Sequence, residues 1–244
     1  MLKSKIQKKK IVFLGASITQ GRISANFVQM LKKQTGTGKY TYINQGVAGY
    51  ETYNILTKLH KAVRTDPDFV FILVGTNDVQ SSMDPELARL SRKLKKIPHE
   101  PTLDHFIRNM TEIVKRLKQE TRAEIAVISL PVLGENLEST ANRQIDTYNA
   151  ALKKISETEG IHYLPANEKQ KRYLLDKNHG KGKDIVQGTR MAFRSLIRHY
   201  LLRKTLDAIS AENGYLLLTD GIHLNTRGAE IITDEIKGFL TNNS

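Results

Sequence analysis

The sequence lacks cysteine and lacks any long run of apolar residues, and each absence excludes a class of protein or site. Without cysteine the chain cannot form a disulfide, a thiolate zinc site or a cysteine nucleophile. No apolar run approaches the ~20 residues that a membrane-spanning helix needs. The apolar stretch 11–14, which follows a basic N-terminus, is shorter than the ~7–15 residues of a signal-peptide core. We therefore expect a cytoplasmic protein, although a leader that had been removed would leave no trace.

The net charge of +13 is confined to two parts of the chain. Residues 1–10 hold five lysines and no acid, and residues 165–206 hold eleven Lys and Arg against three acids. The rest of the chain is neutral. Such a surplus predicts attraction to an anionic partner, such as a membrane surface, a nucleic acid or an anionic substrate. The alternative interpretation is a solvated face that keeps the protein soluble.

Strand-like stretches alternate along the chain with stretches in which apolar residues recur at helical spacing. The predicted strands are 10–14, 40–44, 69–74, 124–130 and 161–164. The predicted helices are 24–34, 52–64, 103–119, 141–158 and 226–240, the last with Asn225 or Thr226 as its N-cap. This alternation is typical of an α/β protein with an open parallel sheet between two helical layers. In such sheets ligands bind at the carboxyl ends of the strands.

Two segments fit the alternation poorly. Residues 83–101 are polar and basic, and we expect a short helix and a loop there. Residues 165–212 are longer than a simple connection. Within them the Gly- and Lys-rich stretch 177–188 is predicted to be mobile, and the apolar spacing of 191–209 predicts an amphipathic helix. We therefore predict a single domain over residues 1–244, with a basic, mainly helical insertion at about 165–212.

Ser17 follows the first predicted strand directly and lies between Gly15 and Gly21. A serine in this place is often only a helix cap, but the flanking glycines permit the tight turn that exposes a nucleophile. The segment has neither the Lys-Ser/Thr pair of a phosphate-binding loop nor the glycine spacing of a dinucleotide site. A serine nucleophile needs a neighbouring base to take its proton.

Asp220 and His223 supply that base and a carboxylate that could orient it, three positions apart near the other end of the chain. A histidine near a helix start is often only structural, but with a distant activated serine the role of a base is favoured. A metal site is disfavoured because no second histidine or carboxylate lies at ligand spacing. The Ser17 and Asp220-x-x-His223 motifs together suggest an esterase-like hydrolase.

Two further blocks follow the second and third predicted strands. Gly49 lies in the glycine-containing stretch 44–49, and Asn77 lies in the stretch 75–78. Taken alone, each is an ordinary loop or turn pattern. At the carboxyl edge of a parallel sheet, however, the backbone N–H of Gly49 and the side-chain amide of Asn77 could both donate to a developing oxyanion.

In content and order, the four blocks resemble those of the SGNH hydrolases, the GDSL-type esterases and lipases. The resemblance implies a flavodoxin-like three-layer α/β/α fold with a central five-stranded parallel sheet, and hydrolysis of esters through an acyl-enzyme without a metal or other cofactor. It implies that Ser17 is the nucleophile, that His223 is the general base and then acid, and that Asp220 orients His223. The oxyanion hole would combine the N–H groups of Ser17 and Gly49 with the Asn77 amide.

One residue departs from the family pattern, because Ala16 stands where the family usually has an aspartate before the serine. That aspartate is not part of the triad, so the chemistry is expected to survive the change. The expected substrates are small acyl esters: acetylated sugars, short-chain esters or lysophospholipids. The alternative function is a non-catalytic binding or scaffold protein on the same fold. Specific nucleic-acid binding is not expected, because the sequence has no basic motif of the kind in which aromatics are interleaved and matches no recognised module.

Overall fold

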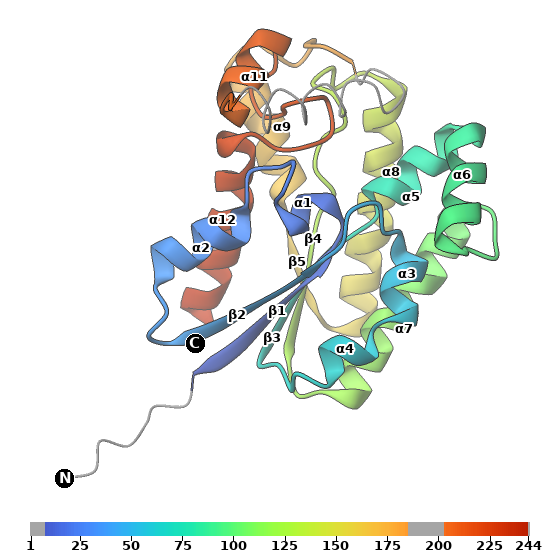
Figure 1. The fold of residues 1–244 in the computed structure, drawn as a ribbon, viewed down its shortest axis with the longest axis vertical. Coiled ribbons are helices and arrows are strands. Elements are labelled where there is room, and N and C mark those ends of the chain that lie inside the picture. The colour runs from blue at the N-terminus through green and yellow to red at the C-terminus, as the bar shows by residue number, and fades with distance from the viewer. Residues whose placement is uncertain (1–7, 185–202, 244) are drawn as a thin grey trace.

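A five-stranded, wholly parallel sheet forms the centre of the molecule. The computed structural model describes residues 8–184 and 203–243. The sheet has the order β2-β1-β3-β4-β5, in which β1, the first strand along the chain, lies inside the sheet (Figure 1). The strands are β1 (Lys9–Gly15), β2 (Tyr40–Gly46), β3 (Phe69–Leu73), β4 (Glu124–Ile128) and β5 (His162–Leu164). The predicted five-stranded parallel sheet is therefore confirmed, with the strand order of flavodoxin-like folds.

Both faces of the central strands are buried, which explains why their sequences are continuous apolar runs. All five residues of β3 are buried, and so are the last five residues of β1. Phe13 of β1 and Phe71 of β3 stack with their ring centroids 5.6 Å apart. Phe71 also meets Phe239 of the last helix edge to face at 5.5 Å. The sheet is thus the middle layer of the core.

Helices cover the sheet on both sides, which gives the three layers that the alternation predicts (Figure 1). Helices α2, α9 and α12 pack together on one face, and α3, α7 and α8 pack together on the other. The helices of the described chain are α1 (Ser17–Gln20), α2 (Phe27–Thr35), α3 (Thr52–Thr57), α4 (His60–Val63), α5 (Thr76–Met83), α6 (Pro85–Lys95), α7 (Leu103–Glu120), α8 (Thr140–Glu159), α9 (Ala166–Asp176), α11 (Leu206–Asn213) and α12 (Thr226–Asn242).

Several helix limits differ from the predicted ones for local reasons. Helix α2 begins at Phe27, not at residue 24, because the Asn26 side chain caps it by accepting from the backbone N–H of Gln29. The predicted helix 52–64 is two short helices, since Lys58 leaves helical geometry at φ −112° and ψ 9°. The stretch 83–101 contains all of α6, which Asp84 caps. Helix α12 has Asn225 as its N-cap, one of the two residues predicted.

The long segment 165–212 has a helix at each end. Helix α9 follows β5 almost directly, and α11 is tied to the start of α12 because Asp207 accepts from both the backbone and the hydroxyl of Thr226. The predicted helix 191–209 falls mostly on residues 185–202, outside the described part of the chain. The predicted mobility of 177–188 stays a prediction.

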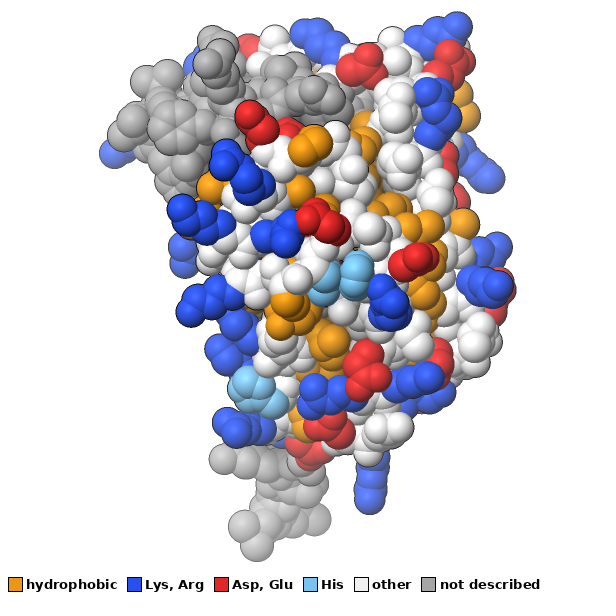
Figure 2. All heavy atoms as spheres, turned by 90° about the vertical axis from the view of Figure 1, so that its right-hand side faces the viewer, with side chains coloured by type: hydrophobic (Ala, Val, Ile, Leu, Met, Phe, Trp, Pro, Cys, Tyr) orange, Lys and Arg blue, Asp and Glu red, His pale blue; other side chains and the backbone are white. Residues whose placement is uncertain are grey.

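Part of the basic charge in this segment is used in ion pairs within the protein. Lys169 pairs with Glu235, and Lys171 pairs with Asp146. The face that carries α3, α6 and α7 mixes Lys and Arg with Asp and Glu, and shows no broad patch of one sign (Figure 2). Within residues 8–184 and 203–243, the helices are too short or too polar to span a bilayer.

Candidate active site

Three of the predicted blocks lie at one edge of the sheet, where parallel strands end. Ser17 begins α1 two residues after β1, Gly49 follows β2, and Asn77 lies in the first turn of the helix after β3. The amide N–H of Val47 donates to the Gly15 carbonyl at 3.1 Å, so the loop after β2 is held against the end of β1. The carboxyl edge of the sheet therefore brings these blocks together, as expected for this class of fold.

Gly15 allows the chain to turn sharply between β1 and Ser17. A Cβ atom at this position would lie 2.1 Å from Thr19 Oγ1 and 2.4 Å from the carbonyl oxygen of Leu73 on the neighbouring strand. No residue with a side chain can fit there unless the turn or β3 moves. The close approach places the start of α1, and hence Ser17, directly over the end of the sheet.

The segment that carries Asp220 and His223 is a tight turn closed by its own hydrogen bonds. The Thr219 amide donates to the His223 carbonyl at 2.7 Å, and one Asp220 oxygen accepts from the amides of Ile222 (3.0 Å) and His223 (2.8 Å). The spacing Asp-x-x-His thus lets the aspartate cap the turn with one oxygen. Its other oxygen stays available for the imidazole.

Ser17, His223 and Asp220 form one continuous row of hydrogen bonds. His223 Nε2 lies 2.9 Å from Ser17 Oγ, and His223 Nδ1 lies 2.8 Å from Asp220 Oδ2. The three residues are 8%, 5% and 2% exposed, respectively. Burial alone would raise the pKa of Asp220, but the charge of His223 and the hydrogen bonds from His223 and Ile222 outweigh it and lower the pKa. The carboxylate is therefore held ionised beside the imidazole.

Gly49 and Asn77 lie in segments that are bonded to each other. The Asn77 side-chain amide donates to the Tyr50 carbonyl at 2.8 Å, which uses one of its two N–H groups. The next residue, Asp78, accepts from both the backbone N–H and the hydroxyl of Thr52. Gly49 has φ of +76°, in the left-handed region that glycine adopts most readily. These contacts fix the loop that follows Gly49 relative to Asn77.

Ala16, the departure from the family pattern, is the N-cap residue of the four-residue helix α1. Its methyl side chain offers no acceptor, and α1 accordingly has no side-chain hydrogen bond at its cap. The residue is buried, and its carbonyl accepts from the Gln20 amide at 2.9 Å. Alanine at this position therefore leaves α1 without a side-chain cap, but the hydrogen bond from Gln20 still closes the turn that contains Ser17.

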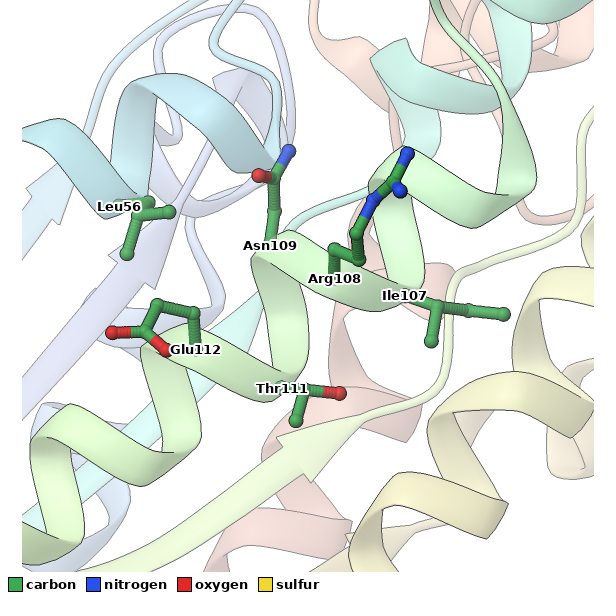
Figure 3. Close-up of a pocket in the computed structure, with 6 residues that line it drawn as sticks. All are labelled: Leu56, Ile107, Arg108, Asn109, Thr111 and Glu112. Carbon is green, nitrogen blue, oxygen red and sulfur yellow. The ribbon is translucent and has the colours of Figure 1, made fainter.

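A shallow hollow of about 460 Å³ lies elsewhere, on the surface of α3 and α7 (Figure 3). None of the residues that line it belongs to the predicted site. Figure 3 shows that the side chains from α7 point in different directions and, with Leu56 of α3, do not converge on one point. Ligand sites are marked by a few polar groups that converge, so we assign no function to this hollow. Its lining is Leu56, Ile107, Arg108, Asn109, Thr111 and Glu112.

Sequence reasoning missed Glu135, a wholly buried carboxylate bonded to the segment that precedes Asp220. It follows β4 as Ser17, Gly49 and Asn77 follow the three preceding strands. The rule that polar residues after parallel strands gather at one edge could have identified it.

A family model, the GDSL-like lipase/acylhydrolase family, matches residues 13–231. No curated protein sequence gives a significant match.

Several solved structures share the fold. An acetyl xylan esterase superposes with a TM-score of 0.66 at 16% identity, covering 94% of this chain and 98% of its own. An acetylxylan esterase from Geobacillus stearothermophilus gives 0.64 at 17% identity, covering 96% and 94%. An alpha/beta hydrolase from the metagenome of Lake Arreo, Spain, gives 0.66 at 17% identity, covering 96% and 97%. At this identity the likeness establishes the fold, whereas the family model covers most of the sequence. The chain belongs to the GDSL-like lipase/acylhydrolase family and is a carboxylic ester hydrolase with a three-layer α/β/α fold.

Proposed function

We propose that the protein hydrolyses small acyl esters through an acyl-enzyme on Ser17. The row of hydrogen bonds from Ser17 through His223 to Asp220 carries this proposal. As Ser17 Oγ attacks the acyl carbon, His223 Nε2 takes the hydroxyl proton and the carbonyl electrons move onto oxygen. His223 then gives the proton to the leaving alkoxide. Water attacks the acyl-serine in the same way, with His223 first as base and then as acid, and releases the carboxylic acid and free Ser17.

Asp220 orients the imidazole and stabilises the imidazolium that forms in each step. Its lowered pKa supports this role, because it favours the charged carboxylate beside the imidazole. The bond to Nδ1 keeps Nε2 free of a proton and directed at Ser17.

The proposed oxyanion hole is formed by the N–H groups of Ser17 and Gly49 and by the second N–H of the Asn77 amide. The bond from Asn77 to Tyr50 supports this assignment, since it fixes the amide before substrate arrives. Such preorganised donors each contribute about 3–4 kcal/mol in the transition state, where the negative charge develops. Glycine at 49 leaves the approach of the acyl group free of a side chain.

For the substrate we propose an acetyl or another short acyl group on a sugar or a small alcohol. The likeness of fold to acetyl xylan esterases supports acetylated sugars, with lysophospholipids as the other class to be tested. An anionic substrate or a membrane surface would be favoured by the basic segment 165–212, but Lys169 and Lys171 are already paired within the protein. The family assignment argues against a non-catalytic scaffold.

The first test is hydrolysis of p-nitrophenyl acetate by the protein beside Ser17→Ala. We expect a burst of p-nitrophenol, turnover by the parent, and loss of at least about 10³-fold in kcat in the variant. A panel of longer p-nitrophenyl esters, acetylated xylo-oligosaccharides and lysophosphatidylcholine then ranks the substrate classes by kcat/KM. Equal rates in parent and variant across the whole panel would contradict the proposal.

A further inference from the structure

A buried carboxylate outside the proposed triad binds the backbone of the segment that leads to Asp220 and His223. Glu135 Oε1 accepts from the amides of Leu217 (2.7 Å), Leu216 (3.0 Å) and Leu218 (3.1 Å). Its Oε2 accepts from Leu216 at 2.8 Å. Three consecutive amides of one segment therefore converge on a single side chain that is 0% exposed.

The backbone beside Glu135 contacts the same segment on the far side of Asp220. The Gly134 amide donates to the Gly221 carbonyl at 2.8 Å. The loop after β4 thus holds the segment 216–221 at both ends, with the Glu135 side chain before Asp220 and the Gly134 N–H after it. A displacement of Glu135 would be passed directly to the turn that carries Asp220 and His223.

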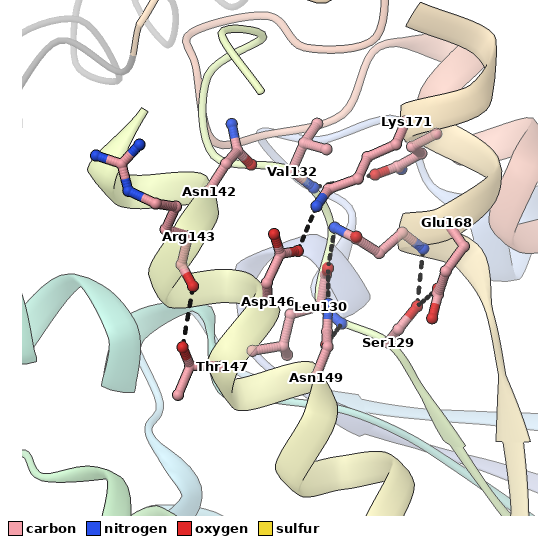
Figure 4. A network of polar contacts seen from close by, with 12 residues as sticks. Ser129, Leu130, Val132, Asn142, Arg143, Asp146, Thr147, Asn149, Glu168 and Lys171 are labelled. Atoms are coloured by element: carbon pink, nitrogen blue, oxygen red, sulfur yellow. Dashed lines mark hydrogen bonds and ion pairs between the residues drawn. The ribbon is translucent and has the colours of Figure 1, made fainter. Parts of the chain in front are cut away.

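The loop after β4 is itself fixed by buried side-chain amides from α8 and α9 (Figure 4). Asn149 accepts from the Leu130 amide and donates to the Leu130 carbonyl, at 2.7 and 3.1 Å. Gln170 accepts from the Val132 amide at 3.1 Å. Asn142 accepts from the Leu133 amide at 3.1 Å and donates back to its carbonyl at 3.0 Å. Glu135 therefore extends from a loop that is bonded to two helices.

Burial of a carboxylate is costly unless hydrogen bonds to its charged form compensate for the lost water. Glu135 obtains that compensation from the amides of the segment 216–218. His179 Nε2 also lies 2.9 Å from Glu135 Oε2 and forms an ion pair when protonated. An apolar side chain of similar size could fill this space, but it could not hold three N–H groups in place.

We infer that Glu135 is a positioning residue for ester hydrolysis, which sets the place of Asp220 and His223 relative to Ser17. This inference rests on the proposed function. Because Glu135 acts on the catalytic segment and not on the ester, its loss lowers kcat and leaves KM nearly unchanged. A displacement of about 1 Å in a reacting group costs about 100-fold in rate.

The test compares Glu135→Gln and Glu135→Asp with Glu138→Gln, a change at an exposed carboxylate three positions further along the same loop. In Gln the carboxylate charge is lost, and one acceptor is replaced by an N–H that opposes the Leu216 amide. Asp keeps the charge on a shorter side chain. For each protein we would measure kcat and KM for p-nitrophenyl acetate per titrated active site, and the rate at which diethyl p-nitrophenyl phosphate phosphorylates Ser17. The proton NMR signal of His223 Nδ1–H reports the bond to Asp220 directly.

We expect Glu135→Gln to lose about 100-fold in kcat and in phosphorylation rate, with KM within about threefold and a shifted Nδ1–H signal. Glu135→Asp should recover part of the rate, and Glu138→Gln should match the parent. If Glu135 has only a structural role, its variants should have fewer active sites or a lower Tm, but an unchanged rate per active site and an unchanged Nδ1–H signal. That result would overturn the inference. If Glu135→Gln does not fold, Glu135→Asp decides, since a parental kcat in that variant overturns the inference equally.

Failure of the proposed function has a different signature. In that case the parent itself shows no turnover of the ester panel and no phosphorylation of Ser17. If the parent reacts at Ser17 and the Glu135 variants react equally fast, the proposed function stands and only the positioning role is lost.

Discussion

Ser17 Oγ and His223 Nε2 lie 2.9 Å apart, although 206 positions separate the two residues in the chain. A few residues further along, two more hydrogen bonds join the same two loops. The Leu224 amide donates to Ser24 Oγ at 3.1 Å, and the Ala25 amide donates to the Leu224 carbonyl at 2.8 Å. The loop after the proposed nucleophile and the loop of the proposed base are therefore bonded directly to each other.

Ser24→Ala should test whether this contact supports the site. The change leaves the Leu224 amide without its partner in a buried place, which costs about 1–3 kcal/mol of unfolding free energy. We also expect a lower kcat, since His223 adjoins Leu224. Urea unfolding and kcat for p-nitrophenyl acetate check the two effects. The exposed Thr37→Ala should change stability by less than about 0.5 kcal/mol, and an equally small effect of Ser24→Ala would contradict the prediction.

Asp220→Asn should separate the role of the carboxylate from its shape. The amide cannot stabilise the imidazolium and favours the wrong tautomer of His223, so we expect kcat to fall by about 10⁴-fold. The folded-state pKa of Asp220 is lowered, so its contribution to stability is present above the unfolded pKa of about 3.9 and is lost as pH falls through the folded value. Unfolding measured at about pH 7 and about pH 3 should show a larger advantage of the parent over the variant at the higher pH.

The contribution of Asp78 to stability should depend on pH in the direction opposite to that of Asp220. Burial, followed by the charge of Glu51, raises the pKa of Asp78 to about 7. Between about pH 4 and about pH 7 the folded protein holds a proton that the unfolded chain has lost, so stability falls as pH rises through this window. The full shift of the Asp78 pKa corresponds to roughly 4 kcal/mol of unfolding free energy.

The variant Asp78→Asn removes this titration and serves as the comparison for the parent. Unfolding free energies at about pH 5 and about pH 8 should decline more steeply for the parent than for the variant. Parallel pH profiles for the two proteins would show that Asp78 is ionised throughout this range.

The parallel sheet and the four motif blocks could be predicted from the sequence because each leaves a local pattern. Continuous apolar runs mark buried strands, and Ser17 and Asn77 each follow such a run, whereas Gly49 follows the more exposed strand β2. The break at Lys58 leaves no such signal, because the apolar spacing of 52–64 continues across it. The position of Glu135 after β4 could have placed it at this edge of the sheet, but its role could not be predicted. Its partners are the amides of residues 216–218, about 80 positions away, and backbone groups leave no trace in sequence.

Asn77→Ala should show whether the Asn77 amide stabilises the negative charge of the oxyanion. The Asn77 amide is fixed by its bond to the Tyr50 carbonyl, and its second N–H acts only when the oxyanion forms. We therefore expect kcat to fall by about 10²–10³-fold while KM for p-nitrophenyl acetate stays nearly constant. Asn109→Ala is the control, because Asn109 is a buried asparagine that donates to Thr52 Oγ1 at 3.2 Å, in the same region but without a proposed contact to the ester. That control should lose stability and keep kcat within a few-fold. If the two variants lose kcat equally, Asn77 acts by supporting the loop after β2, and the oxyanion is held by backbone N–H groups alone.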